Sequence, residues 1–499
     1  MILSFDSVYF SYPSSIEPVL RNISAGFHEG WTGISGDNGA GKTTLLLLAA
    51  GLLRPCSGQV SGAGGIYCPQ RTDDIPDSWE DFFYAGDKEA GRIMSRLGIE
   101  ADWPFRWETL SHGERKRMQI GAALWRQPEI LAMDEPTNHL DREAAGLVAG
   151  ILESYRGIGL LVSHDRALLD GICGQCLFIR DGAARLRPGG ISQGLREEER
   201  EALEMLRERK RLVDTRERLA QESEARRKVV EGSRKRLSKK NVDPKDGDTK
   251  RKIDLARLSG KDRTGADRYK RMENRLARLD TELKNAAVPV RRKCGITLEA
   301  GPAKMDRLCV IPAGTLALGG GRGLSFPELV IYPGDRIAVT GPNGAGKSSL
   351  IRFIIDTCLP KQKAHALLYL PQEISAGESA AALDALEAES AGARGGILAR
   401  FSRLGSDPRL LLQSRLPSPG EIRKLMIARG VSGNPALIIM DEPLNHMDLR
   451  SIRLFEETLS EVTCTMILVS HDEAFLSRLT AKEWAISADG RVLASYARS

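Results

Sequence analysis

Two stretches decide how the chain is organised: Gly36-Asp37-Asn38-Gly39-Ala40-Gly41-Lys42-Thr43-Thr44 and Gly341-Pro342-Asn343-Gly344-Ala345-Gly346-Lys347-Ser348-Ser349. They are nearly identical, and their lysines lie 305 residues apart. Three further strings recur in the same order at offsets of 302 to 307 residues, ending or centred at Gln70 and Gln372, Asp134 and Asp441, and His164 and His471. Repetition at a nearly fixed offset indicates two copies of one domain.

Both glycine-rich stretches fit the phosphate-loop pattern G-x-x-x-x-G-K-[ST]. Glycine frees backbone N–H groups to surround phosphates, the following helix presents its positive end, and the lysine reaches the outer phosphates. A hydroxyl at Thr43 or Ser348 can hold magnesium. The predicted nucleotide-binding residues are Gly36, Asn38, Gly39, Ala40, Gly41, Lys42, Thr43 and Thr44 in the first copy, and Gly341, Asn343, Gly344, Ala345, Gly346, Lys347, Ser348 and Ser349 in the second.

Each copy also has an apolar run that ends in two acids, Asp134-Glu135 and Asp441-Glu442. The run predicts a buried strand, and an acid at its carboxyl end lies at the crevice where open α/β sheets bind ligands. We expect Asp134 and Asp441 to support magnesium, and Glu135 and Glu442 to orient or deprotonate the attacking water.

His164 and His471 follow further apolar strands at residues 160–163 and 467–470. A single histidine is usually structural, but two equivalent ones beside phosphate loops indicate contact with the outer phosphate. The catalytic candidates are therefore Glu135, Glu442, His164 and His471.

The two copies flank a charged insert at residues 196–290, which holds 29 Lys plus Arg and 20 Asp plus Glu. It accounts for all of the basic excess of the chain, whose net charge is +6. A narrow apolar stripe at Met205, Leu212 and Leu219, with neighbours Leu206 and Val213, and a second at Met272, Leu276, Leu279 and Leu283 predict two long antiparallel helices. The breaker-rich stretch 241–247 is expected to turn the chain between them.

The end of the first predicted helix, residues 226–240, carries eight basic residues and one acid. So dense a run of like charge repels itself unless a polyanion neutralises it, which favours phosphate-backbone binding over a merely solvated helix face. Tyr269 is the insert's single aromatic residue, so base stacking is not supported. The nucleic-acid-binding candidates are Arg234, Lys235, Arg236, Lys239 and Lys240.

The composition excludes several protein classes. The longest apolar stretch, residues 45–53, is about half of what a bilayer-spanning helix requires, so we expect no membrane partner. The amino terminus has no basic region followed by a long apolar run, which predicts no secretory signal and a cytoplasmic protein. The eight scattered cysteines are interpreted as reduced thiols, and the lone pair Cys173 and Cys176 lacks the second pair typical of a zinc site.

At this point the motifs resemble those of the ATP-binding cassette superfamily, and their tandem arrangement is similar to its ABC-F branch. The resemblance covers essentially the whole chain. It implies that Gln70 and Gln372 touch the metal and the attacking water, that Tyr12 stacks on adenine, and that Ser111 and Gly113 belong to a signature motif. It also implies composite sites closed around two ATP and Mg²⁺: Lys42 with Ser418 and Gly420, and Lys347 with Ser111 and Gly113. The magnesium residues would be Thr43, Gln70, Asp134, Ser348, Gln372 and Asp441.

The second copy departs from the family pattern. Its signature reads Pro417-Ser418-Pro419-Gly420-Glu421 where the family has Leu-Ser-Gly-Gly-Glu, and residues 315–321 contain no aromatic residue to stack on adenine. We expect two functionally unequal sites that both hydrolyse ATP, since each keeps its glutamate and histidine.

The predicted fold is α/β, with two P-loop ATP-binding cassette domains at residues 1–192 and 293–499 joined by a long antiparallel helical hairpin at residues 193–292. The resemblance implies a monomer, with its cassettes pairing within the chain, that inserts the hairpin into the ribosome near ribosomal RNA and tRNA at the exit site. Two roles are open: translation regulation, and ribosome protection against antibiotics. The alternatives are an ATP-binding subunit of a transporter with separate membrane subunits, which leaves the insert unexplained, and a DNA-processing ATPase.

Overall fold

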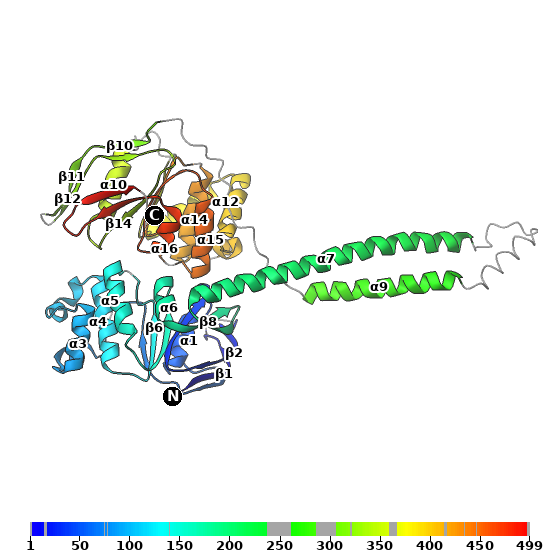
Figure 1. Ribbon diagram of the computed structural model, residues 1–499, viewed down its shortest axis with the longest axis horizontal. Helices are drawn as coiled ribbons and strands as arrows, with labels where there is room; N and C mark the ends of the chain where they lie inside the picture. The colour runs from blue at the N-terminus through cyan, green and yellow to red at the C-terminus, as the bar shows by residue number, and fades with distance from the viewer. Residues whose placement is uncertain are drawn as a thin grey trace, which may run out of the picture. The chain divides into compact units, whose positions relative to one another are not determined.

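The computed structural model describes residues 2–13, 17–73, 75–76, 78–138, 140–236, 261–285, 306–319, 322–358, 367–413, 417–433, 435–445 and 447–496. The chain forms two compact units, one of residues 1–194 with 292–499 and one of residues 195–291. The first unit holds both copies of the repeat, and the second holds the charged insert (Figure 1).

The first copy is built on a six-stranded sheet in the order β5-β6-β7-β3-β8-β9. Neighbouring strands are parallel from β5 to β8, and β9 is antiparallel to β8. The strands of this copy are β1 (Leu3–Phe10), β2 (Leu20–Phe27), β3 (Gly30–Gly36), β4 (Ser57–Ser61), β5 (Ile66–Cys68), β6 (Ile130–Asp134), β7 (Ile158–Val162), β8 (Cys173–Arg180) and β9 (Ala183–Pro188).

The second copy repeats this sheet in the order β15-β16-β17-β14-β18-β19, with the last pair again antiparallel. Its strands are β10 (Cys309–Ile311), β11 (Gly314–Gly319), β12 (Arg322–Phe326), β13 (Leu329–Ile331), β14 (Arg336–Thr340), β15 (Leu367–Leu370), β16 (Leu437–Asp441), β17 (Thr465–Val469), β18 (Lys482–Ile486) and β19 (Val492–Tyr496). The duplication is therefore present in the topology as well as in the motifs.

The central strands are apolar because helices cover both faces of a parallel sheet. Every residue of β6, β7, β16 and β17 is buried. The helices of the first copy are α1 (Lys42–Ala49), α2 (Trp79–Tyr84), α3 (Lys88–Leu97), the 3-10 helix η1 (Trp103–Thr109), α4 (His112–Trp125), α5 (Arg142–Leu152) and α6 (Arg166–Ile172). Those of the second are α10 (Lys347–Cys358), α11 (Ala376–Glu387), α12 (Ala391–Arg403), α13 (Pro408–Gln413), α14 (Pro419–Ser432), α15 (Leu449–Ser460) and α16 (Glu473–Leu479).

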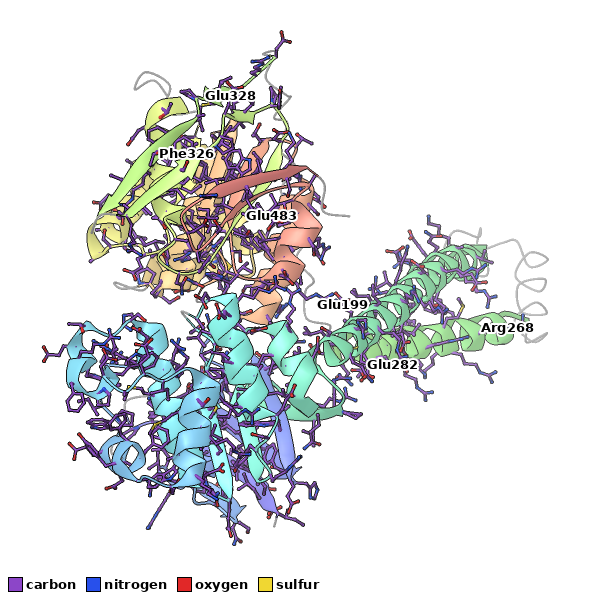
Figure 2. All side chains as sticks on the ribbon, turned by 60° about the vertical axis from the view of Figure 1, so that its left-hand side comes forward. Glu199, Arg268, Glu282, Phe326, Glu328 and Glu483 are labelled. Atoms are coloured by element: carbon purple, nitrogen blue, oxygen red, sulfur yellow. The ribbon has the colours of Figure 1, made fainter. Side chains whose placement is uncertain are left out.

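Small antiparallel sheets complete each core: β2-β1-β4 in the first copy, and β10-β13 and β11-β12 in the second. Aromatic pairs close both cores. Phe5 on β1 meets Phe27 on β2 edge to face, with ring centroids 5.7 Å apart. The ring centroid of Phe326, which is labelled on β12 in Figure 2, lies 5.6 Å from that of Phe353 on α10. These rings belong to the same apolar clusters as residues of the strand that precedes each phosphate loop, β3 in the first copy and β14 in the second.

The insert forms the predicted helical hairpin, with α7 (Ile191–Arg236) and α9 (Lys261–Asn285) side by side (Figure 1). Leu219 and Leu279 are the most deeply buried of the predicted stripe residues, each 9% exposed. Arg216 Nε lies 2.9 Å from Asp280 Oδ1, an ion pair that joins the two helices. Charged side chains, among them Glu199, Arg268 and Glu282, stand out along both helices (Figure 2).

The expectation that Met205 belongs to the hairpin's apolar stripe is wrong, because its side chain is 51% exposed. Arg216 of α7 pairs with Asp280 of the antiparallel α9, and α9 ends five residues later at Asn285. α9 therefore ends before the level of Met205, and the neighbouring Leu206 is partly buried. The predicted turn at residues 241–247 lies outside the described residues.

The expectation that all cysteines are reduced is also wrong, because Cys309 on β10 is disulfide-bonded. A disulfide forms only where the fold brings two thiols to within bonding geometry, which sequence spacing does not reveal. Free thiols are present at Cys56, Cys68, Cys173, Cys176 and Cys464. None of the described helices combines the length and apolar character needed to cross a membrane.

Candidate functional site

Three adjacent parallel strands in each copy end at one edge of the sheet, and each carries a predicted site residue at its carboxyl end. In the first copy, β3 leads into the phosphate loop, β6 ends at Asp134, and β7 is followed by His164 after one residue. In the second copy, β14, β16 and β17 place the loop, Asp441 and His471 in the same order. The sheet therefore brings together groups that lie up to 124 residues apart in the sequence.

The phosphate loops have a backbone that glycine permits and other residues resist. Gly39 and Gly41 have φ of 80° and 97°, and Gly344 and Gly346 have φ of 73° and 100°. Such positive φ values are unfavourable for residues with a Cβ. At Gly41 an added Cβ would also approach Leu20 Cδ2 to 2.7 Å.

Each loop lysine points back into its own loop. Lys42 Nζ donates to the carbonyl oxygens of Gly36 and Asp37, at 2.7 and 3.2 Å. Lys347 Nζ donates to those of Gly341 and Pro342, at 2.7 and 3.0 Å. The other predicted loop residues lie in the same loops or in the first turn of the following helix: Asn38, Gly39, Ala40, Thr43 and Thr44, and Asn343, Gly344, Ala345, Ser348 and Ser349. The loop therefore holds an ammonium group where an anion would enter.

A hydroxyl and a carboxylate meet beside each loop. Thr43 Oγ1 donates to Asp134 Oδ2 at 2.7 Å, and Ser348 Oγ donates to Asp441 Oδ2 at 2.6 Å. Among the residues that the structure describes, no cluster of three or more His, Cys, Asp or Glu side chains could hold a metal ion. One carboxylate with one hydroxyl is nevertheless the oxygen donor set that Mg²⁺ uses when substrate phosphates supply further ligands. The pairs Thr43 with Asp134 and Ser348 with Asp441 fit that ion.

The two glutamates sit on strained backbone. Glu135 has φ of 49° and Glu442 has φ of 46°, both in the left-handed region. Their backbone N–H groups donate to the carbonyl oxygens of Val162 and Val469, at 2.8 and 2.9 Å. A non-glycine residue held there costs on the order of 1–3 kcal/mol and persists only where the surrounding fold enforces it. The fold thus imposes the same unfavourable turn in both copies.

Both glutamate side chains are buried against the histidine of their own copy. Glu135 is 4% exposed, with Oε1 at 3.1 Å from His164 Nε2. Its Oε2 accepts a hydrogen bond from the backbone N–H of His164 at 3.2 Å. In the second copy Glu442 is 8% exposed, and its Oε1 is 3.5 Å from His471 Nε2.

Burial controls the protonation of these groups. It raises the pKa of Glu135 above its ordinary range and that of Glu442 to about 8. Burial also lowers the pKa of His471 to about 4, and the nearby Lys347 charge adds to that effect. Desolvation penalises the charged form of each group, so Glu442 tends towards a neutral acid and His471 towards a neutral imidazole.

In the second copy the imidazole of His471 contacts two loop residues. Its Nε2 lies 3.4 Å from Lys347 Nζ and 3.2 Å from Asn343 Oδ1. Thr340, which immediately precedes the loop, donates to Glu483 Oε1 on β18 at 2.7 Å. A neutral imidazole at this position can exchange hydrogen bonds with a bound phosphate without adding charge.

The two signature motifs have the same local structure despite their different sequences. Ser111 caps α4 with φ −64° and ψ 157°, and Ser418 caps α14 with φ −64° and ψ 152°. Each serine forms a capping box with the glutamate three residues later. Pro419 occupies the first helical position, where a missing N–H is tolerated. Gly113 and Gly420 lie in the first turns of these helices.

The remaining predicted residues are distributed as follows. The Tyr12 hydroxyl is 3.0 Å from Thr44 Oγ1, and its ring packs edge to face on Phe10, which places the aromatic ring beside the first loop. Gln70 and Gln372 are exposed after β5 and β15, next to the strands that end in the acids. Arg234, Lys235 and Arg236 lie in the last turn of α7, whereas Lys239 and Lys240 lie outside the described residues.

Sequence reasoning missed three residues that contact the acid segments. The Tyr67 hydroxyl donates to Asp134 Oδ2 at 3.3 Å. Lys116 and Arg423, each 1% exposed, donate to backbone carbonyls of the acid segments. The signal in the sequence is a cation at the same position of both copies, five residues after each signature serine and 307 residues apart.

The raised pKa of Glu442 predicts a pH-dependent stability that Glu442→Gln removes. Because the folded-state pKa of about 8 exceeds the ordinary 4.5, the folded chain retains a proton that the unfolded chain has lost between these values. Stability from this group is therefore present at low pH and lost as pH rises through about 8. We expect the Tm advantage of Glu442→Gln over the nucleotide-free parent to be at least about 2 °C larger at pH 8 than at pH 5.

The control for this measurement is Glu461→Gln, which changes an exposed carboxylate at the end of α15. Its Tm should follow that of the parent at both pH values. A Tm difference for Glu442→Gln that does not change with pH would contradict the buried-acid assignment.

The family model described as ABC transporter matches the chain twice, at residues 20–138 and 325–445. The chain is 27% identical to the ribosome protection protein VmlR of Bacillus subtilis, over 96% of this chain and 86% of that protein. It is 29% identical to the tylosin resistance ATP-binding protein TlrC of Streptomyces fradiae, over 93% of each chain. It is also 26% identical to the energy-dependent translational throttle protein EttA of Escherichia coli K12, over 95% of this chain and 90% of that protein.

Solved structures agree on the fold. The archaeal ribosome recycling factor aABCE1, in complex with the stalk protein aP1, matches with a TM-score of 0.62 at 19% identity, over 98% of this chain and 89% of that one. The structure titled RNase-L Inhibitor matches with a TM-score of 0.62 at 18% identity, over 98% and 90%. With both cassettes matched and relatives aligned along nearly the whole chain, this protein is an ATPase with two ATP-binding cassette domains in tandem, and the relatives to which it is similar are ABC-F proteins.

Proposed function

We propose that the protein binds and hydrolyses two ATP molecules at composite sites and uses this cycle to insert its helical hairpin into the ribosome. In that role it regulates translation or protects the ribosome against antibiotics. The observation that carries the proposal is the combination of two equally built ATPase sheets with a hairpin whose far end is strongly basic. The named roles of VmlR, TlrC and EttA in resistance and translation support the same partner.

The proposed chemistry uses the chain's own groups in defined positions. Lys42 and Lys347 bind the outer phosphates from within their loops. Their ammonium groups then donate to phosphate oxygens in place of the loop carbonyls that they contact in this structure. In their ionised forms Glu135 and Glu442 orient the attacking water and take its proton, and a raised carboxyl pKa makes each carboxylate a stronger base. His164 and His471, which lie against these glutamates, contact the outer phosphate beside them. A bound Mg²⁺, held by Thr43 with Asp134 and by Ser348 with Asp441, would neutralise charge on the phosphates.

The signature serines complete the proposed sites from the opposite copy. Ser111 and Gly113 would serve the site of Lys347, and Ser418 and Gly420 the site of Lys42. The equal capping geometry of α4 and α14 supports a working signature in both copies. Tyr12 beside the first loop, with no aromatic residue at 315–321, supports unequal adenine binding.

The proposed domain division is two cassettes at residues 1–192 and 293–499 with a hairpin linker at 193–292. Closure of the cassettes on ATP would move the hairpin against ribosomal RNA and tRNA, and hydrolysis would release it. The basic segment 226–240 would contact the phosphate backbone. A cytoplasmic protein that acts as a monomer is consistent with this partner.

Trapping the ATP-bound state tests the ribosomal partner. Replacing both Glu135 and Glu442 by Gln removes the proton acceptors and keeps the shape, so turnover should fall by roughly 100-fold or more while ATP binding is retained. In a sucrose gradient of cell lysate, the variant should migrate with ribosomes in ATP and not in ADP. Recovery in the membrane or DNA fraction instead would refute the partner and favour a transporter subunit or a DNA-processing ATPase.

Salt dependence tests the basic end of the hairpin. Replacing Arg234, Lys235, Arg236, Lys239 and Lys240 by Gln should weaken ribosome binding and reduce the slope of log affinity against log salt by about one unit for each phosphate that the variant no longer neutralises. The matched control removes five exposed charges nearer the start of α7, at Arg207, Arg209, Lys210, Arg211 and Arg218, and should leave the slope close to that of the parent. An equal slope for the parent and both variants would show that the basic segment is only a solvated face.

A further inference from the structure

Each copy contains one buried cation that donates hydrogen bonds to backbone carbonyls beside the site. The chemistry described above gives these cations no role. Lys116 lies on α4 five residues after Ser111, and Arg423 lies on α14 five residues after Ser418. Both are 1% exposed on helices whose other inward residues are mostly apolar. Burying a cation costs free energy unless it is paired or hydrogen-bonded. A buried cation at the same position of both copies therefore indicates a function for its contacts.

The reason lies in the carbonyls that they bind. Lys116 Nζ donates to Pro69 O at 2.6 Å and to Asp134 O at 3.2 Å. Pro69 immediately precedes Gln70, and Asp134 immediately precedes Glu135. One ammonium group therefore joins the backbone of the glutamine segment to that of the acid segment.

Arg423 makes the same bridge in the second copy, displaced by one residue along both segments. Its Nη1 donates to Glu442 O at 2.8 Å, and its Nη2 donates to Gln372 O. The carbonyl of Glu442 belongs to the residue held at positive φ. The two strands involved, β15 and β16, are parallel neighbours, as β5 and β6 are in the first copy.

We propose that Lys116 and Arg423 are positioning residues that tie each signature helix to the glutamine and glutamate segments of its own cassette. A movement of α4 or α14 is then passed to Gln70 with Glu135, or to Gln372 with Glu442, without contact between the cation and the nucleotide. Because each signature is proposed to serve the opposite site, the bridge gives the two sites a mechanical connection. This deepens the proposed site roles and does not depend on the ribosomal partner.

The neighbouring residues on the same helices provide matched controls. Arg117 Nη1 donates to the carbonyls of Leu97 and Gly98, and its guanidinium lies 4.7 Å from the Trp103 ring. Lys424 Nζ donates to Ser406 Oγ and Ser451 Oγ. Both cations are held by polar groups away from the glutamine and acid segments, so their replacement tests helix packing alone.

The test compares Lys116→Met and Arg423→Met with Arg117→Met and Lys424→Met, all without ribosomes. Each copy is read separately by single-turnover hydrolysis, with Lys116→Met in a Glu442→Gln background and Arg423→Met in a Glu135→Gln background. We expect hydrolysis to fall on the order of 10- to 100-fold, as for groups that orient metal-site residues. Affinity for a fluorescent ATP analogue in EDTA should stay within about twofold of the parent, since the cations do not touch the phosphate loop. The increase in affinity that Mg²⁺ gives over EDTA should be smaller in the variants than in the parent.

Conservative variants separate positioning from general stability. Lys116→Arg and Arg423→Lys keep a cation and should recover much of the hydrolysis that the methionine variants lack. Wild-type hydrolysis in the methionine variants would overturn the proposal, as would equal reductions of hydrolysis and Tm in these variants and the two controls. If Arg423→Met does not fold, Arg423→Gln decides. A neutral amide in place of the guanidinium should lower hydrolysis without changing affinity in EDTA, and unchanged hydrolysis would refute the role of Arg423.

Failure of this inference and failure of the proposed function give different results. Loss of ribosome binding alone would leave the hydrolysis measurements intact. Normal turnover in the doubly substituted Glu135→Gln and Glu442→Gln protein would instead remove the glutamate roles on which the positioning rests.

Discussion

The nucleotide chemistry of this chain depends on the parallel alignment of three strands that end at one sheet edge. In a parallel sheet all carboxyl ends face the same way, so the phosphate loop, the acid pair and the histidine converge although the intervening segments differ in length. The fully apolar strands that achieve this are held by burial on both faces. A shift of one strand along its neighbours would separate the hydroxyl from the carboxylate that it now meets at 2.6 to 2.7 Å.

Burial serves chemistry as well as stability at this edge. Glu442 and His471 are desolvated together, which moves their pKa values in opposite directions and leaves both inclined to be neutral. The same desolvation, together with the positive φ of both glutamates, makes the site costly to maintain. Buried cations on the signature helices donate hydrogen bonds to backbone carbonyls of these acid segments. The desolvation and backbone strain at the site lower the free energy of unfolding, and burial of apolar side chains in the surrounding cores offsets that loss.

Much of the fold could be predicted from local sequence, because phosphate loops and buried strands carry strong local patterns. The two sheets, the positions of the loops and the helical hairpin are confirmed. What could not be predicted depends on long-range contact: the Lys116 and Arg423 bridges, the Tyr67 contact to Asp134 and the disulfide at Cys309. Met205 departs from the predicted stripe because α9 ends at Asn285, before the level of Met205, and a heptad pattern does not show where the partner helix ends. The roles of the site residues stay predictions, since geometry places them without showing turnover.

The central claim is that each copy of the repeat holds one nucleotide. It is tested most directly by counting ATP bound at saturation by the Glu135→Gln and Glu442→Gln protein, alone and with Lys42→Ala or Lys347→Ala added. The account predicts two ATP per chain for the doubly substituted protein and one for each lysine variant. A single ATP per chain, abolished by one lysine substitution and unaffected by the other, would contradict it.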